Sequence, residues 1–195
     1  TAPAYGCSEE RLGVLLAGQR EHWLLCTKVG EEFDGTRSAF DFSPAHTRAS
    51  IERSLRRLRT DVLDIALVHS DGRDLDIIHR EGTLEALAEM KRAGLVRAIG
   101  MSVKSVEGGL AAAPQCDVLM VTLNTGEPEG TAVLESCADL GRGVLVKKAL
   151  AGGHAAPGQG LALALGQRGC SAVLVGTISP EHLRENVEAA RAVLG

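Results

Sequence analysis

The stretch Ile65-Ala66-Leu67-Val68-His69 is an apolar run that ends in a histidine, and Ala98-Ile99-Gly100-Met101-Ser102 repeats this form one segment later. Each run is continuously apolar instead of alternating with polar residues. Continuous runs are typical of strands buried on both faces, as in a parallel sheet covered by helices. The segment between them ends at Gly94, and glycine commonly closes a helix just before a strand. This stretch therefore predicts a β-α-β unit with parallel strands.

The same pattern recurs along the rest of the chain. Further apolar runs occupy residues 24–29, 118–121, 144–147 and 172–176. Capping residues and apolar residues at helical spacing predict helices near residues 8–17, 44–59, 82–93, 104–112, 130–140, 160–167 and 180–194. Ser43-Pro44 and Ser179-Pro180 each give a capping serine followed by proline at the first helical position. Repeated β-α units predict an α/β fold, either an open doubly wound sheet or a closed (β/α)8 barrel.

The composition of the chain excludes several classes of protein. The 195 residues carry a formal net charge of −4, which offers no basic surface for nucleic acid or for an anionic membrane. No apolar run approaches the ~20 residues that a membrane-spanning helix needs. The five cysteines form no CxxC pair and show no metal-type spacing with histidine. They indicate reduced thiols in a cytoplasmic protein, without a metal site.

Polar residues stand where three of the predicted strands end. Functional groups of parallel α/β proteins gather at the carboxyl ends of strands. Lys28, His69 and Ser102 end consecutive runs, and Tyr5, which is the only tyrosine, precedes the first helix. Each residue alone also fits a structural role, because a lysine can extend to the surface and a histidine can be held by internal hydrogen bonds. Their combination predicts a functional site.

Residues 31–42, which follow the first strand, hold three of the five aromatic residues of the chain. These are Phe33, Phe40 and Phe42. They predict either one wall of a substrate pocket or a hydrophobic plug that packs the loop down, and the sequence favours neither.

The order of the polar residues resembles the aldo-keto reductase family. The matching motifs in chain order are Thr1-Ala-Pro-Ala-Tyr5-Gly-Cys-Ser-Glu-Glu-Arg-Leu-Gly13, Thr27-Lys28-Val29-Gly30, Leu67-Val68-His69, Gly100-Met101-Ser102, and Gly176-Thr177-Ile178-Ser179-Pro180 with the helix after it. The resemblance implies a (β/α)8 TIM barrel, with residues 1–195 as a single domain that lacks the first two strands and the first helix. It also implies an aspartate immediately before Thr1, as the partner of the catalytic lysine.

The resemblance implies that Tyr5, Lys28 and His69 are catalytic, with the tyrosine as general acid and base. The chemistry of these residue types agrees with that assignment. Hydride transfer to a carbonyl builds negative charge on its oxygen, so a proton donor must lie within hydrogen-bond reach. A phenol ionises only at about pH 10, and an adjacent ammonium such as that of Lys28 favours the phenolate. His69 would orient the carbonyl oxygen.

The resemblance implies NADPH or NADP+ as the cofactor. The residues expected to bind it are Ser102, Lys147, Lys148, Gly176, Thr177, Ser179, His182, Glu185 and Asn186. The two lysines would neutralise the pyrophosphate, and the start of the last helix favours an anion. Gly176 and His182 stand where NADPH-specific relatives often carry lysine and arginine, which leaves NADH open. Val103 and Met120 replace amide side chains of the family pattern near the nicotinamide.

These observations predict an oxidoreductase that reduces an aldehyde or ketone, or oxidises the alcohol, as a small-molecule substrate. The alternative is a non-catalytic, NADP(H)-binding regulatory subunit of the same fold, because some members of the family serve as channel subunits and a fold alone does not establish turnover. The identity of the substrate and the oligomeric state stay open at this point.

Overall fold

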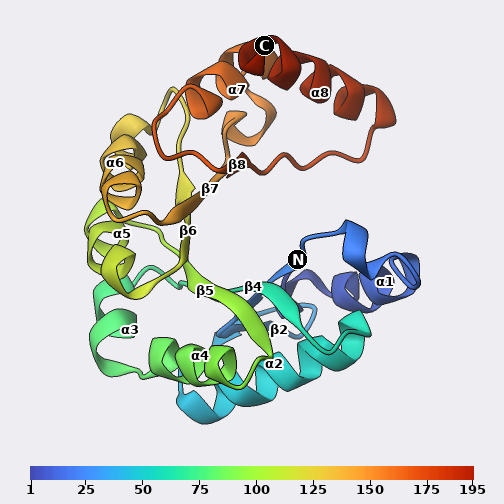
Figure 1. Cartoon of the computed structure of the whole chain (residues 1–195), viewed down its shortest axis with the longest axis vertical. Helices are drawn as coiled ribbons and strands as arrows, with labels where there is room; N and C mark the ends of the chain where they lie inside the picture. The colour runs from blue at the N-terminus through green and yellow to red at the C-terminus, as the bar shows by residue number, and fades with distance from the viewer.

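The computed structural model describes residues 1–195 as a curved parallel sheet with helices along its convex side (Figure 1). The six strands lie in the order β1-β4-β5-β6-β7-β8, and each pairs in parallel with its neighbour. Their bounds are β1 Cys26–Val29, β4 Leu63–His69, β5 Val96–Ser102, β6 Val118–Thr122, β7 Gly143–Lys147 and β8 Ala172–Val173. The order follows the chain without the reversal of a doubly wound sheet. The sheet therefore has the topology of a barrel.

Eight α-helices connect or flank the strands. They are α1 Ser8–Leu15, α2 Pro44–Leu58, α3 Asp74–Arg80, α4 Thr83–Arg92, α5 Val106–Ala112, α6 Thr131–Asp139, α7 Pro157–Leu165 and α8 Pro180–Leu194. Helices α1 and α8 lie at the two ends of the curved molecule (Figure 1). All seven predicted helices are present, within a few residues of their expected bounds. None of the helices combines the length and apolar character needed to cross a membrane.

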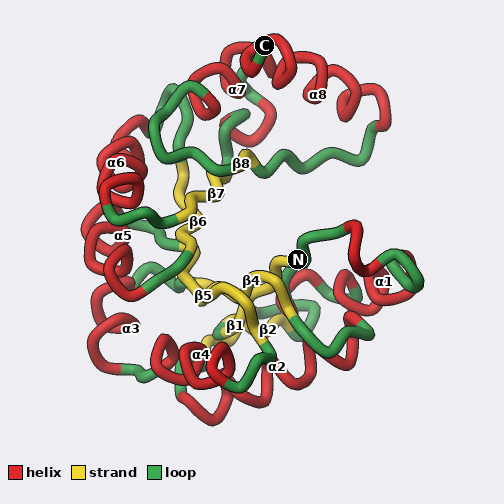
Figure 2. Tube along the Cα trace, viewed as in Figure 1, coloured by secondary structure: helices red, strands yellow, loops and turns green.

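Several details differ from the expectation. Helix α3 forms where the sequence pattern indicates none, and a short antiparallel hairpin follows β1, with strands β2 Glu31–Phe33 and β3 Ser38–Phe40. Helix α7 begins at Pro157, three residues before the predicted start, because glycines at positions 158 and 160 hide the helical pattern. Strand β8 ends at Val173, so Gly176 lies in the loop between β8 and α8 (Figure 2).

The predicted helix ends are set by local hydrogen bonds. The Oγ of Ser43 accepts from the backbone N–H of His46, and the Oγ of Ser179 accepts from that of His182. Each serine thus satisfies a donor that the first turn of a helix leaves free. Gly94 follows α4 with a φ of 79°, a left-handed conformation that glycine adopts without strain.

The sheet and the helices bury one apolar core. Ile51 of α2, Leu87 of α4 and Leu119 of β6 are all fully buried in it. The strands approach closely at Gly100 of β5, where a Cβ atom would lie 1.6 Å from the carbonyl oxygen of Val118 on β6. A side chain at position 100 would therefore force the two strands apart.

Candidate active site

Tyr5 and Lys28 meet where strand β1 passes beside Pro3–Tyr5, a single turn of 3-10 helix. The Nζ of Lys28 lies 3.5 Å from the hydroxyl oxygen of Tyr5 and 4.9 Å from the centre of its ring. The same Nζ donates a hydrogen bond of 3.1 Å to the carbonyl oxygen of Thr1. Lys28 is 5% exposed, whereas Tyr5 is 51% exposed. A buried lysine side chain thus contacts an accessible phenol.

His69 joins this pair from the end of strand β4. Its ring stands at 86° to the ring of Tyr5, with 6.1 Å between the two centroids. The Nδ1 of His69 lies 2.6 Å from Oε2 of Glu31 on strand β2. Burial lowers the pKa of His69 to about 4; Glu31 opposes this shift, and the positive charges of Lys28 and Lys147 reinforce it. His69 is therefore an uncharged imidazole near neutral pH.

Lys147 crosses to the end of strand β5 from the end of β7. Its Nζ donates hydrogen bonds to Oγ of Ser102 at 2.9 Å and to the carbonyl oxygen of Val103 at 2.8 Å. Burial, reinforced by the charge of Lys148, lowers the pKa of Lys147 to about 8. Lys147 and Ser102, which were both assigned to the cofactor, therefore lie in direct contact.

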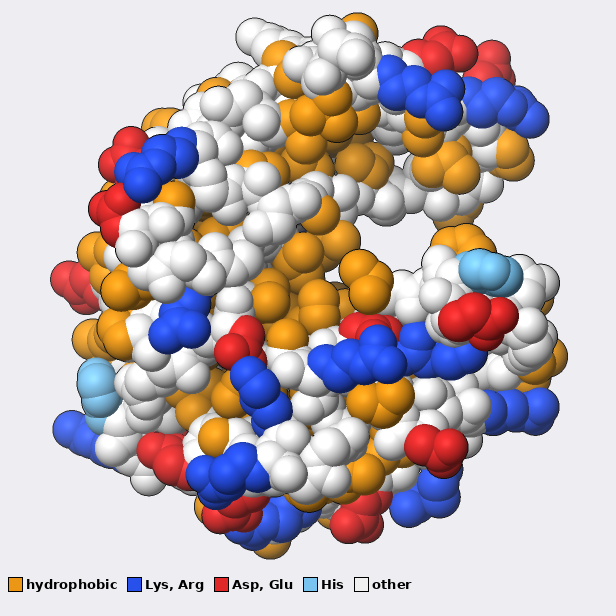
Figure 3. Space-filling model, viewed as in Figure 1, with side chains coloured by type: hydrophobic (Ala, Val, Ile, Leu, Met, Phe, Trp, Pro, Cys, Tyr) orange, Lys and Arg blue, Asp and Glu red, His pale blue; other side chains and the backbone are white.

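These side chains face one cavity of about 820 Å³. Figure 3 shows the molecule hollowed between the part that carries α1 and the part that carries α8. Seven of the predicted catalytic and cofactor-binding residues line the cavity, namely Tyr5, Lys28, His69, Ser102, Lys147, Lys148 and Gly176. The structure thus brings the three expected catalytic residues together with four of the expected cofactor residues.

The remaining cofactor candidates lie on the loop after β8 and on α8, outside the lining of this cavity. They are Thr177, Ser179, His182, Glu185 and Asn186. Asn186 is 6% exposed, and its Oδ1 is buried without a hydrogen-bond partner. Because buried acceptors are nearly always paired, this oxygen is suited to a donor from outside the chain.

Two charged residues of the cavity wall were missed by the sequence analysis. Lys104 lies in the loop after strand β5, and Glu127 lies in the loop between β6 and α6. The position of Lys104, two residues beyond Ser102 at a carboxyl strand end, was an available signal, whereas Glu127 carried none. With Lys104 included, four lysines and one glutamate line the cavity, which favours an anionic ligand.

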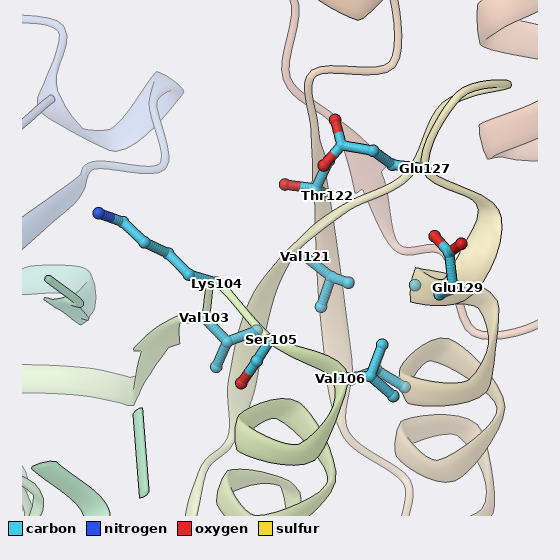
Figure 4. A pocket seen from close by; sticks show the side chains of 10 residues that line it. Val103, Lys104, Ser105, Val106, Val121, Thr122, Glu127 and Glu129 are labelled. Carbon is cyan, nitrogen blue, oxygen red and sulfur yellow. The ribbon is translucent and has the colours of Figure 1, made fainter. Parts of the chain in front are cut away.

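A second pocket, of about 110 Å³, opens where strands β5 and β6 end. Lys104, Thr122 and Glu127 line both this pocket and the larger cavity. Figure 4 shows the side chain of Lys104 extending away from Val106 and Glu129, which belong to the small pocket alone. The two spaces are therefore neighbours that share a wall.

The loop that carries Lys104 is anchored by Asp74 at the start of α3. The buried Oδ2 of Asp74 accepts from the backbone N–H of Lys104 at 3.0 Å and from that of Ser105 at 2.8 Å. The hydroxyl of Ser105 donates to the same oxygen at 2.7 Å. Gly108 gives the carboxylate room, since a Cβ there would lie 2.3 Å from Oδ2. These contacts fix the backbone from which Lys104 enters the cavity.

The three phenylalanines after β1 do not form a cavity wall. None of them lines the cavity, and Phe33 and Phe40 are exposed on the hairpin. Phe42 is buried and lies against Gly30, where a Cβ would come within 2.5 Å of its ring. The structure favours the plug over the substrate wall, with Phe42 as the residue that forms it.

Known proteins resemble the chain in sequence. A model described as the Aldo/keto reductase family matches residues 1–160. The aldo-keto reductase YhdN of Bacillus subtilis (strain 168) is 35% identical over 111 residues, which cover 55% of this chain and 33% of that protein. The D-threo-aldose 1-dehydrogenase of Pseudomonas sp is 29% identical over 174 residues, covering 74% of this chain and 53% of that protein. The chain thus matches between a third and about half of the length of these relatives.

Solved structures resemble the whole chain. PA4992 of Pseudomonas aeruginosa, a protein assigned to the aldo-keto reductases, superposes with a TM-score of 0.96 at 52% identity, covering 100% of this chain and 76% of that one. The holo form of the aldo-keto reductase AKR11C1 from Bacillus halodurans has a TM-score of 0.81 at 23% identity. The match covers 96% of this chain and 74% of that one. The second likeness concerns the fold alone. Both agree with the barrel topology predicted from the sequence, of which this chain forms six strands.

Proposed function

The chain belongs to the aldo/keto reductase family, and on that premise we propose that its protein is an NADP(H)-dependent oxidoreductase. It reduces an aldehyde or a ketone to the alcohol, or oxidises the alcohol in the reverse direction. The observation that carries the proposal is the contact of Lys28 with Tyr5 beside His69, within one cavity. The name of the relative D-threo-aldose 1-dehydrogenase supports redox chemistry of this kind.

Tyr5 is the proton donor of the proposed reduction. When bound, the nicotinamide ring supplies a hydride to the carbonyl carbon, or accepts one from the alcohol. As charge builds on the carbonyl oxygen, the hydroxyl of Tyr5 gives it a proton. Lys28, whose Nζ is 3.5 Å from that hydroxyl, stabilises the phenolate that remains. His69 would hold the substrate oxygen in place for both steps.

The residues of the cavity fit the central part of a nicotinamide dinucleotide. The pyrophosphate needs positive charge, which Lys148 and Lys147 supply at the wall. Ser102 would hold the carboxamide of the nicotinamide, with its hydroxyl already bound by Lys147. Gly176, which also lines the cavity, leaves space for the backbone of the last loop to approach the cofactor.

The start of helix α8 fits the adenosine end of the same cofactor. The unpartnered Oδ1 of Asn186 suits the exocyclic amine of adenine, and Glu185 stands beside it in the sequence. Thr177, Ser179 and His182 surround the first turn of α8, where backbone N–H groups favour the 2′-phosphate of NADPH. Titration of the protein with NADPH and NADH by fluorescence tests this preference.

Replacement of Tyr5 by phenylalanine tests the activity, because it removes only the hydroxyl group. We expect Tyr5→Phe to lower carbonyl reduction about 100-fold or more, while NADPH binds as before. Rates are followed by NADPH oxidation with a panel of aldehydes and ketones. Cys7→Ser is the control, since Cys7 is exposed just beyond the same turn and unpaired. Unchanged turnover in Tyr5→Phe would refute the assignment, and NADPH binding without turnover in the unaltered protein would leave a regulatory role.

The proposal extends to the organisation and location of the chain. Residues 1–195 act as one domain, which the single sheet of six parallel strands supports. All five cysteines are unpaired, which supports a reducing compartment and hence the cytoplasm. Since the chain spans 33% of YhdN, the activity is proposed for the whole protein.

A further inference from the structure

One positively charged side chain of the cavity has no part in the proposed chemistry. It belongs to Lys104, between strand β5 and helix α5, which lines the cavity together with Tyr5 and His69. Lys28 and Lys147, in the same wall, both donate hydrogen bonds within the chain. The ammonium group of Lys104 forms neither a hydrogen bond nor a salt bridge. Its charge is therefore free to meet a ligand.

The carboxylates around Lys104 have other partners. Asp71 accepts hydrogen bonds of 2.9 Å from the backbone N–H and from the guanidinium Nε of Arg73. Glu127 shares the cavity wall, and its Oε1 accepts from the side-chain amide of Asn124 at 3.3 Å. Figure 4 shows the charged ends of Lys104 and Glu127 well apart. No carboxylate of the chain thus neutralises Lys104.

The position of this free charge is set by its backbone. Asp74 accepts from the backbone N–H of Lys104 at 3.0 Å, so the side chain starts from a fixed point at the end of β5. Lys104 is exposed, and its ammonium group is accessible from the cavity. Burial is the main cause of the lowered pKa of His69, and the charge of Lys104 adds to it. The ammonium group therefore lies within electrostatic reach of the proposed place of the carbonyl oxygen.

We propose that Lys104 determines substrate specificity, and that the preferred substrate is an aldehyde that also carries a carboxylate. With the carbonyl oxygen at Tyr5 and His69, the carboxylate accepts a charge-assisted hydrogen bond from Lys104, which is about twice as strong as a neutral one. One ammonium group balances the single charge of a carboxylate, whereas Glu127 in the same wall repels a doubly charged phosphate more strongly. The inference rests on the proposed function and adds the substrate class.

Reduction of aldehyde acids of different length by the whole protein tests the substrate class. The probes are succinic, glutaric and adipic semialdehyde, each compared with its methyl ester, and NADPH oxidation gives kcat/KM. We expect at least one acid to exceed its ester about tenfold, and Lys104→Gln to remove this preference without changing the rates with the esters. Lys104→Arg, which keeps the charge, should retain it. No preference in the unaltered protein, or a preference that survives in Lys104→Gln, overturns the proposal.

Two further variants and a second pair of probes make this result specific. Arg80→Gln is the matched control, because it also removes one positive charge but lies outside the cavity, at the end of α3, where Arg80 pairs with Asp76; it should leave the preference unchanged. Glu127→Gln removes a repelling carboxylate and should raise the preference for the acid about threefold. Glyceraldehyde phosphate is compared with glyceraldehyde, and a larger effect of Lys104→Gln on this pair than on the acids would overturn the assignment to a carboxylate.

Binding of the same probes gives a readout without turnover. Each semialdehyde and its ester are titrated calorimetrically against the protein saturated with NADP+, which has no hydride to give, or against the protein alone where NADP+ does not bind. We expect Lys104→Gln to weaken the preferred acid about tenfold and to leave its ester unchanged. Equal affinities of acid and ester in the unaltered protein overturn the proposal. Absence of any aldehyde reduction would refute the proposed function instead, while this binding difference would still decide the role of Lys104.

Discussion

Replacement of the buried Glu9 by alanine should destabilise the protein strongly, whereas replacement of its neighbour Glu10 should have little effect. Glu9 lies on α1 and is 0% exposed. Its Oε1 accepts hydrogen bonds from the hydroxyl of Thr27 at 2.6 Å and from that of Ser54 at 2.8 Å. Its Oε2 lies 3.5 Å from a guanidinium nitrogen of Arg57, which also contacts Glu10. The Glu9 side chain thus joins α1 to strand β1 and to α2.

The expected loss in the free energy of unfolding follows from these contacts. Thr27 and Ser54 are both 0% exposed, so Glu9→Ala leaves two buried hydroxyls without their acceptor. Hydrogen bonds to a charged group contribute about 1.5–3 kcal/mol each, so the two bonds lost in Glu9→Ala give a loss of about 3–6 kcal/mol. The pair between Glu10 and Arg57 is exposed, and such pairs contribute about 0.2–1 kcal/mol.

Urea unfolding of the two variants, followed by circular dichroism at neutral pH, measures both losses. The expected result is a large fall in the midpoint for Glu9→Ala and almost none for Glu10→Ala. Because Thr27 precedes Lys28 on strand β1, Glu9→Ala should also weaken carbonyl reduction. Equal and small losses in the two variants would refute the reasoning, since they would show that burial of the carboxylate does not matter.

The remaining predictions concern the sheet and the histidine. Gly100→Ala should lower the free energy of unfolding by about 1–3 kcal/mol or more, because the new Cβ would lie 1.6 Å from the carbonyl oxygen of Val118. Thermal unfolding measures the loss, and Gly158→Ala is the control, because a Cβ there meets no atom within 4 Å. Equal losses in the two variants would contradict the prediction. The free energy of unfolding should fall by up to about 3 kcal/mol as the pH drops from 6.5 to about 4. In this range His69 binds a proton in the unfolded chain but not in the folded chain, where its pKa is lowered to about 4. His69→Asn should lose this part of the pH dependence in urea titrations, and an identical slope in both proteins would assign it to other groups.

Elements that depend on local chemistry could be predicted from the sequence. The apolar runs gave all six strands, and the caps at Ser43 and Ser179 placed the starts of α2 and α8 correctly. Helix α3 was missed because Asp74, at its start, is held by the backbone of Lys104 and Ser105, about thirty residues away. Such support comes from the tertiary structure, and no spacing in the sequence reveals it.

In the site, too, some features could be predicted from the sequence, whereas others depend on the tertiary structure. The resemblance in motif order implied that Tyr5, Lys28 and His69 lie together, and the apolar runs placed Lys28 and His69 at the carboxyl ends of predicted strands. The contact of Glu31 with His69 could not be predicted, since it depends on a hairpin that turns a carboxylate back over the sheet. The bond of Lys147 to Ser102 likewise depends on the direction of a long side chain across neighbouring strand ends.

The anchoring of Lys104 by Asp74 has a consequence for how this cavity can change. Asp74 occupies the space that a side chain at position 108 would need, so position 108 can take a larger residue only together with a smaller one at position 74. The same carboxylate holds the backbone of Lys104, which lines the cavity. A paired substitution in the outer helices α3 and α5 would therefore move a charge inside the cavity while leaving every residue of its wall intact. Selection or design could retune the ligand preference of this protein from outside the site.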